Sequence, residues 1–123
     1  MRGREGQKLQ VIVAIEPRSY RQVIGRTIQA LRPHVEVMVL EPSTLRAGVE
    51  RLDPGLVFGN RPDPSAPHGR SAWVEFLPYE EPPARVCLGG RRWELEAVEL
   101  EDLLSLVDEA EELSRAGRDL GGC

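Results

Sequence analysis

Lysine is almost absent from this 123-residue chain, and its absence restricts the chemistry. Sixteen residues are basic, but only Lys8 is a lysine and the other fifteen are arginines. A mechanism that needs a lysine in the folded core is therefore nearly excluded. A GC-rich genome and a hot habitat would each produce such a skew, and the sequence does not separate the two.

Cysteine is also scarce. Cys87 lies inside an apolar strand pattern, and Cys123 is the last residue. Two lone cysteines without nearby histidines do not form a zinc site, and they do not suggest a disulfide framework. We therefore expect a buried thiol at Cys87, a free thiol at Cys123 and no redox role for either.

Long apolar runs are missing as well. No segment approaches the roughly 20 apolar residues that a membrane-spanning helix needs. The opening residues, MRGREGQKLQ, are charged and contain no apolar segment, so they do not resemble a signal peptide. The net charge of −4 gives no general attraction to nucleic acid or to an anionic membrane. We expect a cytoplasmic protein that binds neither.

The composition that is present describes one globular domain. Hydrophobic residues make up 41% of the chain and charged residues 29%, which is ordinary for a folded protein. A domain of this length buries roughly two thirds of its extended-chain surface. We expect a single domain over residues 10–113, a flexible N-terminus at 1–9 and a flexible tail at 114–123.

The first half of the chain alternates strands and helices. Three short segments are predicted to be strands: VIVAI (11–15), VEVMVL (35–40) and LVF (56–58). The continuous β-branched run of VIVAI indicates a strand buried on both faces. Between them, residues 18–32 and 42–52 carry apolar side chains at helical spacing. Short connections between such elements favour right-handed crossovers and a parallel sheet.

The helix expected over 18–32 has the most regular pattern. Ser19 and Gln22 form a plausible capping box at its start. Its apolar side chains fall on one face, which carries Tyr20, Val23, Ile24, Thr27, Ile28 and Leu31. Its arginines lie off that stripe, and Pro33 ends the helix.

The pattern changes after the third strand. Residues 59–70 contain three prolines and two glycines and cannot hold a normal helix. A strand is expected at 72–77, and both a parallel and an antiparallel orientation are open. An acidic helix is expected over 99–112, with acidic residues at its start that suit the helix dipole.

A β-hairpin is expected between that strand and the acidic helix. The segment ARVCLGGRRWELEAV has two apolar-alternating arms around Gly89-Gly90, which suits a two-residue turn with positive φ. This turn places Cys87 opposite Arg92 and Val86 opposite Trp93.

Three segments together resemble a degenerate receiver domain of two-component response regulators. They are VIVAIEPRSYRQVIGRTIQAL, PGLVFGN and VELEDLLSLVDEAEEL, within residues 10–113. The resemblance implies a three-layer, flavodoxin-like α/β fold whose function gathers at the carboxyl ends of the strands. In this chain the second half is altered: a helix is missing after the third strand, and a β-hairpin followed by a helix ends the domain.

The phosphorylation chemistry of that family lacks most of its groups here. The resemblance places Asn60 where the family has its phosphate-accepting aspartate, and only Glu16 stands for the two acidic residues that help to hold Mg²⁺. An amide is a very poor nucleophile toward a phosphoryl group, and the lysine that would pair with that group is absent. We expect no phosphorylation on aspartate, no cofactor, no metal site and no enzymatic activity.

The charges are unevenly distributed. Residues 1–74 hold eleven basic and seven acidic groups, while residues 75–112 hold three basic and twelve acidic groups. In a receiver-like topology the first and last helices lie side by side. The arginine-bearing helix at 18–32 would then neighbour the acidic helix at 99–112, although each exposed ion pair contributes only about 0–1 kcal/mol.

Two functions follow from these observations. The first is a non-catalytic pseudo-receiver, a signalling or regulatory module that binds a protein partner or a second copy of itself. Its interface would use sheet surface left uncovered by the missing helix, and the candidate residues, which core packing would also explain, are Trp73, Phe76, Leu77, Val86 and Trp93. The alternative is a small-molecule or nucleotide sensor, whose crevice would be formed by Glu16, Arg18, Asn60 and Arg61.

Overall fold

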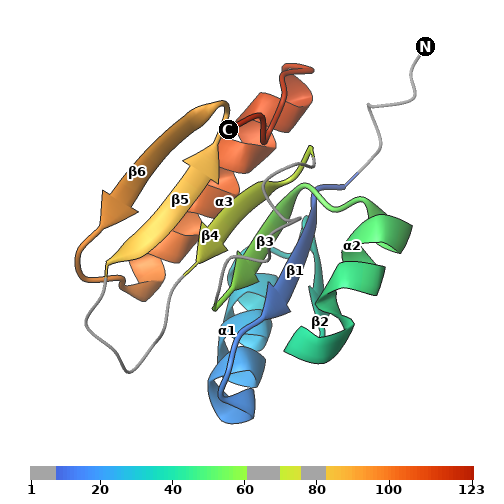
Figure 1. The fold of residues 1–123 in the computed structure, drawn as a ribbon, viewed down its shortest axis with the longest axis vertical. Helices are drawn as coiled ribbons and strands as arrows, with labels where there is room; N and C mark the ends of the chain where they lie inside the picture. Colours follow the sequence, from blue (N-terminus) through green and yellow to red (C-terminus); the bar gives the residue numbers. More distant parts are fainter. Residues whose placement is uncertain (1–7, 61–69, 76–82) are drawn as a thin grey trace.

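A computed structural model describes residues 8–60, 70–75 and 83–123, which form a six-stranded sheet with helices packed against it (Figure 1). The predicted α/β class is confirmed. Three of the predicted site residues, Arg61, Phe76 and Leu77, lie outside the described ranges, as does most of the segment in which a helix is predicted to be missing.

The chain order of the elements follows the predicted alternation. The elements are β1 (Gln10–Ala14), α1 (Arg18–Leu31), β2 (Glu36–Val39), the 3₁₀ turn η1 (Pro42–Thr44), α2 (Leu45–Leu52), β3 (Leu56–Gly59), β4 (Ala72–Glu75), β5 (Ala84–Leu88), β6 (Arg91–Leu95) and α3 (Leu100–Arg115). No helix within the described ranges has the length and apolar character needed to cross a membrane.

The sheet has a parallel half and an antiparallel half. Its strand order is β2-β1-β3-β4-β5-β6. The first four strands in this order are parallel, β5 runs antiparallel to β4, and β6 runs antiparallel to β5. The orientation of β4, which the sequence leaves open, is therefore parallel to β3.

The described helices are divided unequally between the two faces of the sheet. Helices α1 and α3 pack on one face, where they enclose the larger hydrophobic core (Figure 1). Helix α2 packs on the other face, where Leu45 contacts a smaller core built on Ile12, Ala14, Val57 and Trp73. The fold has three layers around β1 and β3, while the smaller core, as far as the described residues show it, contains no residue of β5 or β6.

Helix α1 is rotated relative to the stripe that the sequence predicts. Ile24 and Ile28 are buried as expected, but Val23 is 62% exposed and Arg21 and Gly25 are buried instead. Gly25 allows this rotation, because a Cβ atom at that position would lie 2.6 Å from Cγ2 of Val39. The absence of a side chain lets α1 approach β2 closely.

The helix caps also differ from the prediction. Helix α1 begins at Arg18 with Pro17 as its N-cap, and no side chain caps it. The predicted capping box of Ser19 and Gln22 is therefore wrong, since Ser19 already lies in the first turn. A capping box is instead present at α3, where Glu99 and Asp102 satisfy each other's backbone N–H groups.

The predicted hairpin register is confirmed. Val86 lies opposite Trp93, and Cys87 lies opposite Arg92. Gly89 and Gly90 have φ angles of 65° and 80°, which is the left-handed conformation that a two-residue turn between antiparallel strands requires.

The C-terminal tail is not the loose segment that the sequence predicts. Gly117, with a φ of 72°, turns the chain after α3, and the backbone N–H groups of Gly89 and Gly90 donate to the carbonyls of Leu120 and Gly121 at 2.7 and 2.8 Å. The chain end therefore packs against the turn of the hairpin (Figure 1).

A disulfide ties this tail to the sheet. Cys87 is bonded to Cys123, 36 residues further along the chain, with the two Cα atoms 6.0 Å apart. The expectation of two free thiols is therefore wrong. The sequence shows that two cysteines are present, but it does not show that the tail folds back and brings Cys123 to Cys87.

Candidate functional site

The carboxyl ends of β1 and β3 meet through Glu16 and Asn60, as the sequence predicts. The backbone N–H of Glu16 donates to Oδ1 of Asn60 at 2.5 Å. Nδ2 of Asn60 donates back to the Glu16 carbonyl at 3.4 Å. The amide side chain therefore joins the two strand ends, and both of its polar atoms engage the neighbouring backbone.

Arg21 contributes to this edge of the sheet, and the sequence analysis missed it. Its side chain is only 6% exposed, and Nη1 lies 3.7 Å from Oε1 of Glu16 while donating to the Ile15 carbonyl at 3.3 Å. The available signal was its spacing, because Arg21 lies three residues before Ile24 and seven before Ile28 on the buried side of α1.

Contacts within the chain engage the Asn60 amide and the Arg21 side chain at the predicted crevice, while the Glu16 side chain is 62% exposed. Arg18 is exposed at the first position of α1, and Arg61 lies outside the described residues. Glu16, Asn60 and Arg21 pair with one another or with backbone. In the described part of the chain no three His, Cys, Asp or Glu residues converge in a way that would hold a metal ion.

The described residues of the predicted apolar interface, Trp73, Val86 and Trp93, do not lie on one surface. Cross-strand pairs Val74–Val86 and Val86–Trp93 point to the core beneath α3, where Val86 is 2% exposed and Trp93 is partly buried. Trp73 pairs with Cys87 and lies on the opposite face. Because successive side chains of a strand alternate between faces, Trp73 and Trp93 cannot share a patch.

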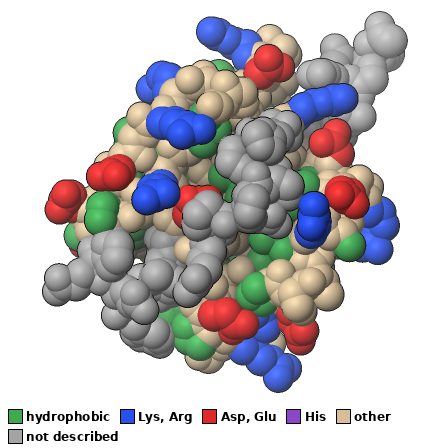
Figure 2. Space-filling model, in the orientation of Figure 1, with side chains coloured by type: hydrophobic (Ala, Val, Ile, Leu, Met, Phe, Trp, Pro, Cys, Tyr) green, Lys and Arg blue, Asp and Glu red, His purple; other side chains and the backbone are tan. Residues whose placement is uncertain are grey.

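The sheet surface beyond α2 carries charge instead. We call this surface the charged face, and it consists of two cross-strand rows, Trp73–Cys87–Arg92 and Glu75–Arg85–Glu94. A hollow of about 450 Å³ lies over these rows. Figure 2 shows acidic and basic side chains interspersed on the part of this face formed by β5 and β6.

Two polar groups of the charged face are shielded from water. Burial raises the pKa of the Glu75 carboxyl above its usual value, and the nearby charges of Arg85 and Arg92 oppose that effect. Nε1 of Trp73 is buried and has no hydrogen-bond partner among the described residues. The inner side of this face therefore holds a partly buried carboxyl group and a buried N–H donor.

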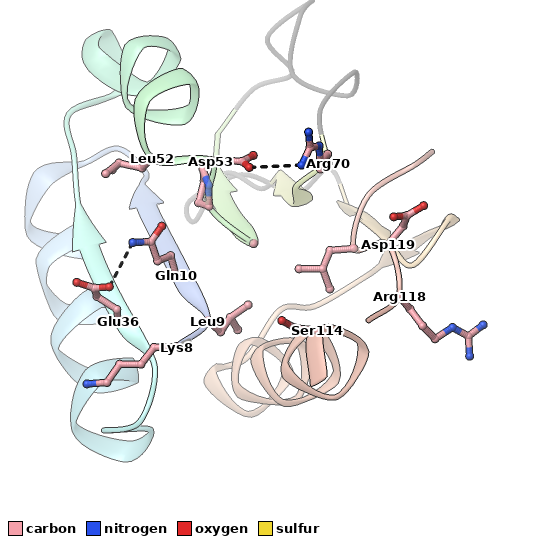
Figure 3. Close-up of a pocket in the computed structure, with 13 residues that line it drawn as sticks. Lys8, Leu9, Gln10, Glu36, Leu52, Asp53, Arg70, Ser114, Arg118 and Asp119 are labelled. Atoms are coloured by element: carbon pink, nitrogen blue, oxygen red, sulfur yellow. Dashed lines mark hydrogen bonds and ion pairs between the residues drawn. The ribbon is translucent and has the colours of Figure 1, made fainter. Parts of the chain in front are cut away.

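A second hollow, of about 550 Å³, lies at the opposite end of the parallel strands (Figure 3). Its rim contains the pairs Gln10–Glu36, with Nε2 donating to Oε1 at 3.2 Å, and Arg70–Asp53, with Nη1 and Oδ2 3.9 Å apart. The folded-back tail supplies another wall, including Leu120. This hollow could not be predicted from the sequence, because the tail that forms its wall is placed by contacts between residues far apart in the chain.

The predicted contact between the basic and acidic helices is confirmed. Nε and Nη2 of Arg32 donate to Oδ1 and Oδ2 of Asp108 at 2.7 and 2.9 Å. Nε2 of His34 lies 2.9 Å from Oε1 of Glu111. The hydrogen bond from Arg32 lowers the pKa of the Asp108 carboxyl. These pairs join the end of α1 to α3 on the face of the sheet that carries the larger core.

Comparisons with protein-family models, with curated proteins and with solved structures find no match for this chain. The resemblance to receiver domains therefore stays a prediction that depends on the residues and topology described above.

Proposed function

We propose that this chain is a non-catalytic, receiver-like interaction module that binds a protein through the charged face. One observation carries the proposal: the sheet continues through β4, β5 and β6 beyond the area that packs against α2. The two rows there carry four charged side chains, beside the buried Trp73 and the disulfide-bonded Cys87: Glu75, Arg85, Arg92 and Glu94. Interspersed charges of both signs provide specificity in protein contacts.

The topology supports the receiver-like part of this proposal. The strand order β2-β1-β3-β4 and the placement of α1 and α2 on opposite faces match the first four strands of a flavodoxin-like sheet. The antiparallel β5 and β6 depart from that pattern, because a parallel fifth strand would be expected. These two antiparallel strands form the outer part of the charged face.

The strand ends support the non-catalytic part. Asn60 stands at the end of β3, where a receiver has its nucleophile, and it is hydrogen-bonded to the Glu16 backbone. Lys8 precedes β1 and lines the hollow at the other end of the strands. Among the described residues, the polar groups that phosphoryl transfer needs are therefore missing or far apart.

The sensor alternative receives less support. A ligand at the predicted crevice would have to compete with the Glu16–Asn60 hydrogen bonds and with Arg21, which holds the Ile15 carbonyl and approaches Glu16. We therefore favour the interaction module over a sensor of small molecules or nucleotides.

The disulfide is unusual for the cytoplasmic location that the sequence predicts. Disulfides persist mainly in oxidising compartments, with intracellular proteins of hyperthermophiles as the established exception. If the Cys87–Cys123 bond is present in the cell, the protein belongs either to an oxidising compartment or to such an organism. Counting free thiols in protein taken directly from its source cells tests whether the bond is present there.

Photo-crosslinking in the source cells tests the interaction itself. A photoreactive amino acid is placed at Arg85, in the middle of the charged face, or at Arg46, an exposed position on α2 that serves as the control. We expect a discrete protein adduct at position 85 and none at position 46. Absence of an adduct at position 85, or the same adduct at both positions, would contradict the proposal.

A further inference from the structure

Strand β6 forms one edge of the sheet. Within the described part of the chain it pairs only with β5. Its five residues, Arg91 to Leu95, are exposed or partly exposed. An edge strand with free backbone groups is a template for pairing with another chain unless the sequence prevents it.

We propose that β6 pairs with β6 of a second copy of this chain, antiparallel and centred on Trp93. The inference rests on the proposed function and specifies one partner of that module. The result would be a symmetric dimer with one continuous sheet, in which the same surface is used by both copies.

The backbone pattern of the hairpin permits this register. In a two-residue hairpin, Leu88 and Arg91 flank the turn as a hydrogen-bonded pair, and such pairs alternate along the strands. Arg92 and Glu94 therefore direct their backbone N–H and C=O groups away from β5, toward the open edge. In a pairing centred on Trp93, Arg92 of each copy faces Glu94 of the other, so the outward groups meet one another.

The side-chain charges fit the same register. Arg92 and Glu94 both belong to the charged face, so the two cross-strand pairs at the dimer axis join opposite charges. Opposite charges directly across an antiparallel pair are favourable, and like charges are unfavourable. Nη2 of Arg92 already donates to the Cys123 carbonyl at 2.9 Å, but a guanidinium has five N–H donors and can serve both partners.

The other face of β6 supplies an aromatic contact at the axis. The guanidinium of Arg91 lies 5.0 Å from the centre of the Trp93 ring and donates to Glu109 of α3 at 2.6 Å. These contacts hold the ring while leaving it partly exposed. Two Trp93 rings would meet at a non-hydrogen-bonded position, where cross-strand side chains approach most closely.

The opposite edge of the sheet lacks this self-complementarity. Strand β2 carries one charged residue, Glu36, followed by Val37, Met38 and Val39. No antiparallel pairing of β2 with itself places an opposite charge across from Glu36. We therefore assign the self-association to β6.

The test is a charge exchange read by sedimentation equilibrium at several protein concentrations. Arg92→Glu alone and Glu94→Arg alone each place like charges across the axis, and each should raise the dimer Kd about tenfold or more. An equimolar mixture of the two variants should restore the wild-type Kd as a heterodimer, because every reversed charge then faces its opposite. Arg46→Glu, an equal change of charge on α2, should leave the Kd unchanged.

Circular dichroism spectra of each variant establish that it is folded before its mass is interpreted. Three results would each overturn the inference. They are a wild-type chain that stays monomeric up to about 1 mM, a dimer that both single variants leave intact, and a mixture of the variants that fails to restore association.

The proposed function is tested separately from this inference. An adduct at position 85 with a different protein would leave the interaction module standing even when β6 pairing is excluded.

Discussion

Asn60 closes the edge of the sheet where a receiver domain would carry out its chemistry, because its amide both accepts from and donates to the backbone of Glu16. An amide side chain can make this reciprocal contact, whereas a carboxylate can only accept. The asparagine at this strand end therefore has a structural role that an aspartate would not fill.

Asn60→Asp should therefore lower the stability of the fold, and it should not make the chain a substrate for phosphorylation. Loss of the Nδ2 donor should destabilise the fold by about 1 kcal/mol, as for a typical hydrogen bond. Intact-protein mass spectrometry after incubation with acetyl phosphate and Mg²⁺ should detect no phosphorylated species of the wild type or the variant. A phosphorylated variant would show that the edge retains more receiver chemistry than we propose.

The Cys87–Cys123 bond should make a large contribution to stability. For a closed loop of 36 residues, the chain-entropy model gives about 4 kcal/mol, lost in Cys123→Ser. Urea unfolding should show the same loss for the wild type in the presence of a dithiol reductant and no further effect of reductant on the variant. Alkylation of the native, unreduced wild type at two thiols would contradict the bond.

Stability should depend on pH through Asp108. The bond from Arg32 lowers the folded-state pKa below the ordinary value of 3.8, so its contribution is present above about pH 4 and is lost as the pH falls through the folded pKa. Because Asp108 is about half exposed, Asp108→Asn should cost only about 0.5–1 kcal/mol at pH 6.

Urea unfolding across a pH series checks this expectation. The difference between the wild type and Asp108→Asn should shrink toward zero as the pH falls below the ordinary value of 3.8 and through the folded-state pKa. Glu112→Gln, at an exposed position of α3, serves as the control and should change the pH profile little. An equal effect of both substitutions would show that general charge, rather than the Arg32 contact, is responsible.

Adjacent residues of α1 should differ sharply in their effect on stability. Ile24→Ala removes a side chain that is 5% exposed and should cost about 2–5 kcal/mol. Val23→Ala, at a position that is 62% exposed, should change stability by less than about 0.5 kcal/mol. Similar losses in thermal or urea unfolding would indicate that the predicted stripe, and not the rotated one, faces the core.

The sequence by itself determined the local elements and one long-range relationship. The alternation of strands and helices, the hairpin register around Gly89-Gly90 and the basic and acidic characters of α1 and α3 were all predictable. These features depend on residue spacing, turn chemistry and charge, which act over a few neighbouring residues. The pairing of Glu16 with Asn60 also followed, because the ends of parallel strands meet at one edge.

Only the tertiary structure decided which surfaces these elements share. Whether Trp73 lies beside Trp93 depends on the register of three strands, and a shift of one residue in that register moves every side chain to the other face. The disulfide and the second hollow likewise depend on how the tail approaches the sheet. That approach is set by contacts between residues far apart in the chain, and no local pattern in the sequence encodes it.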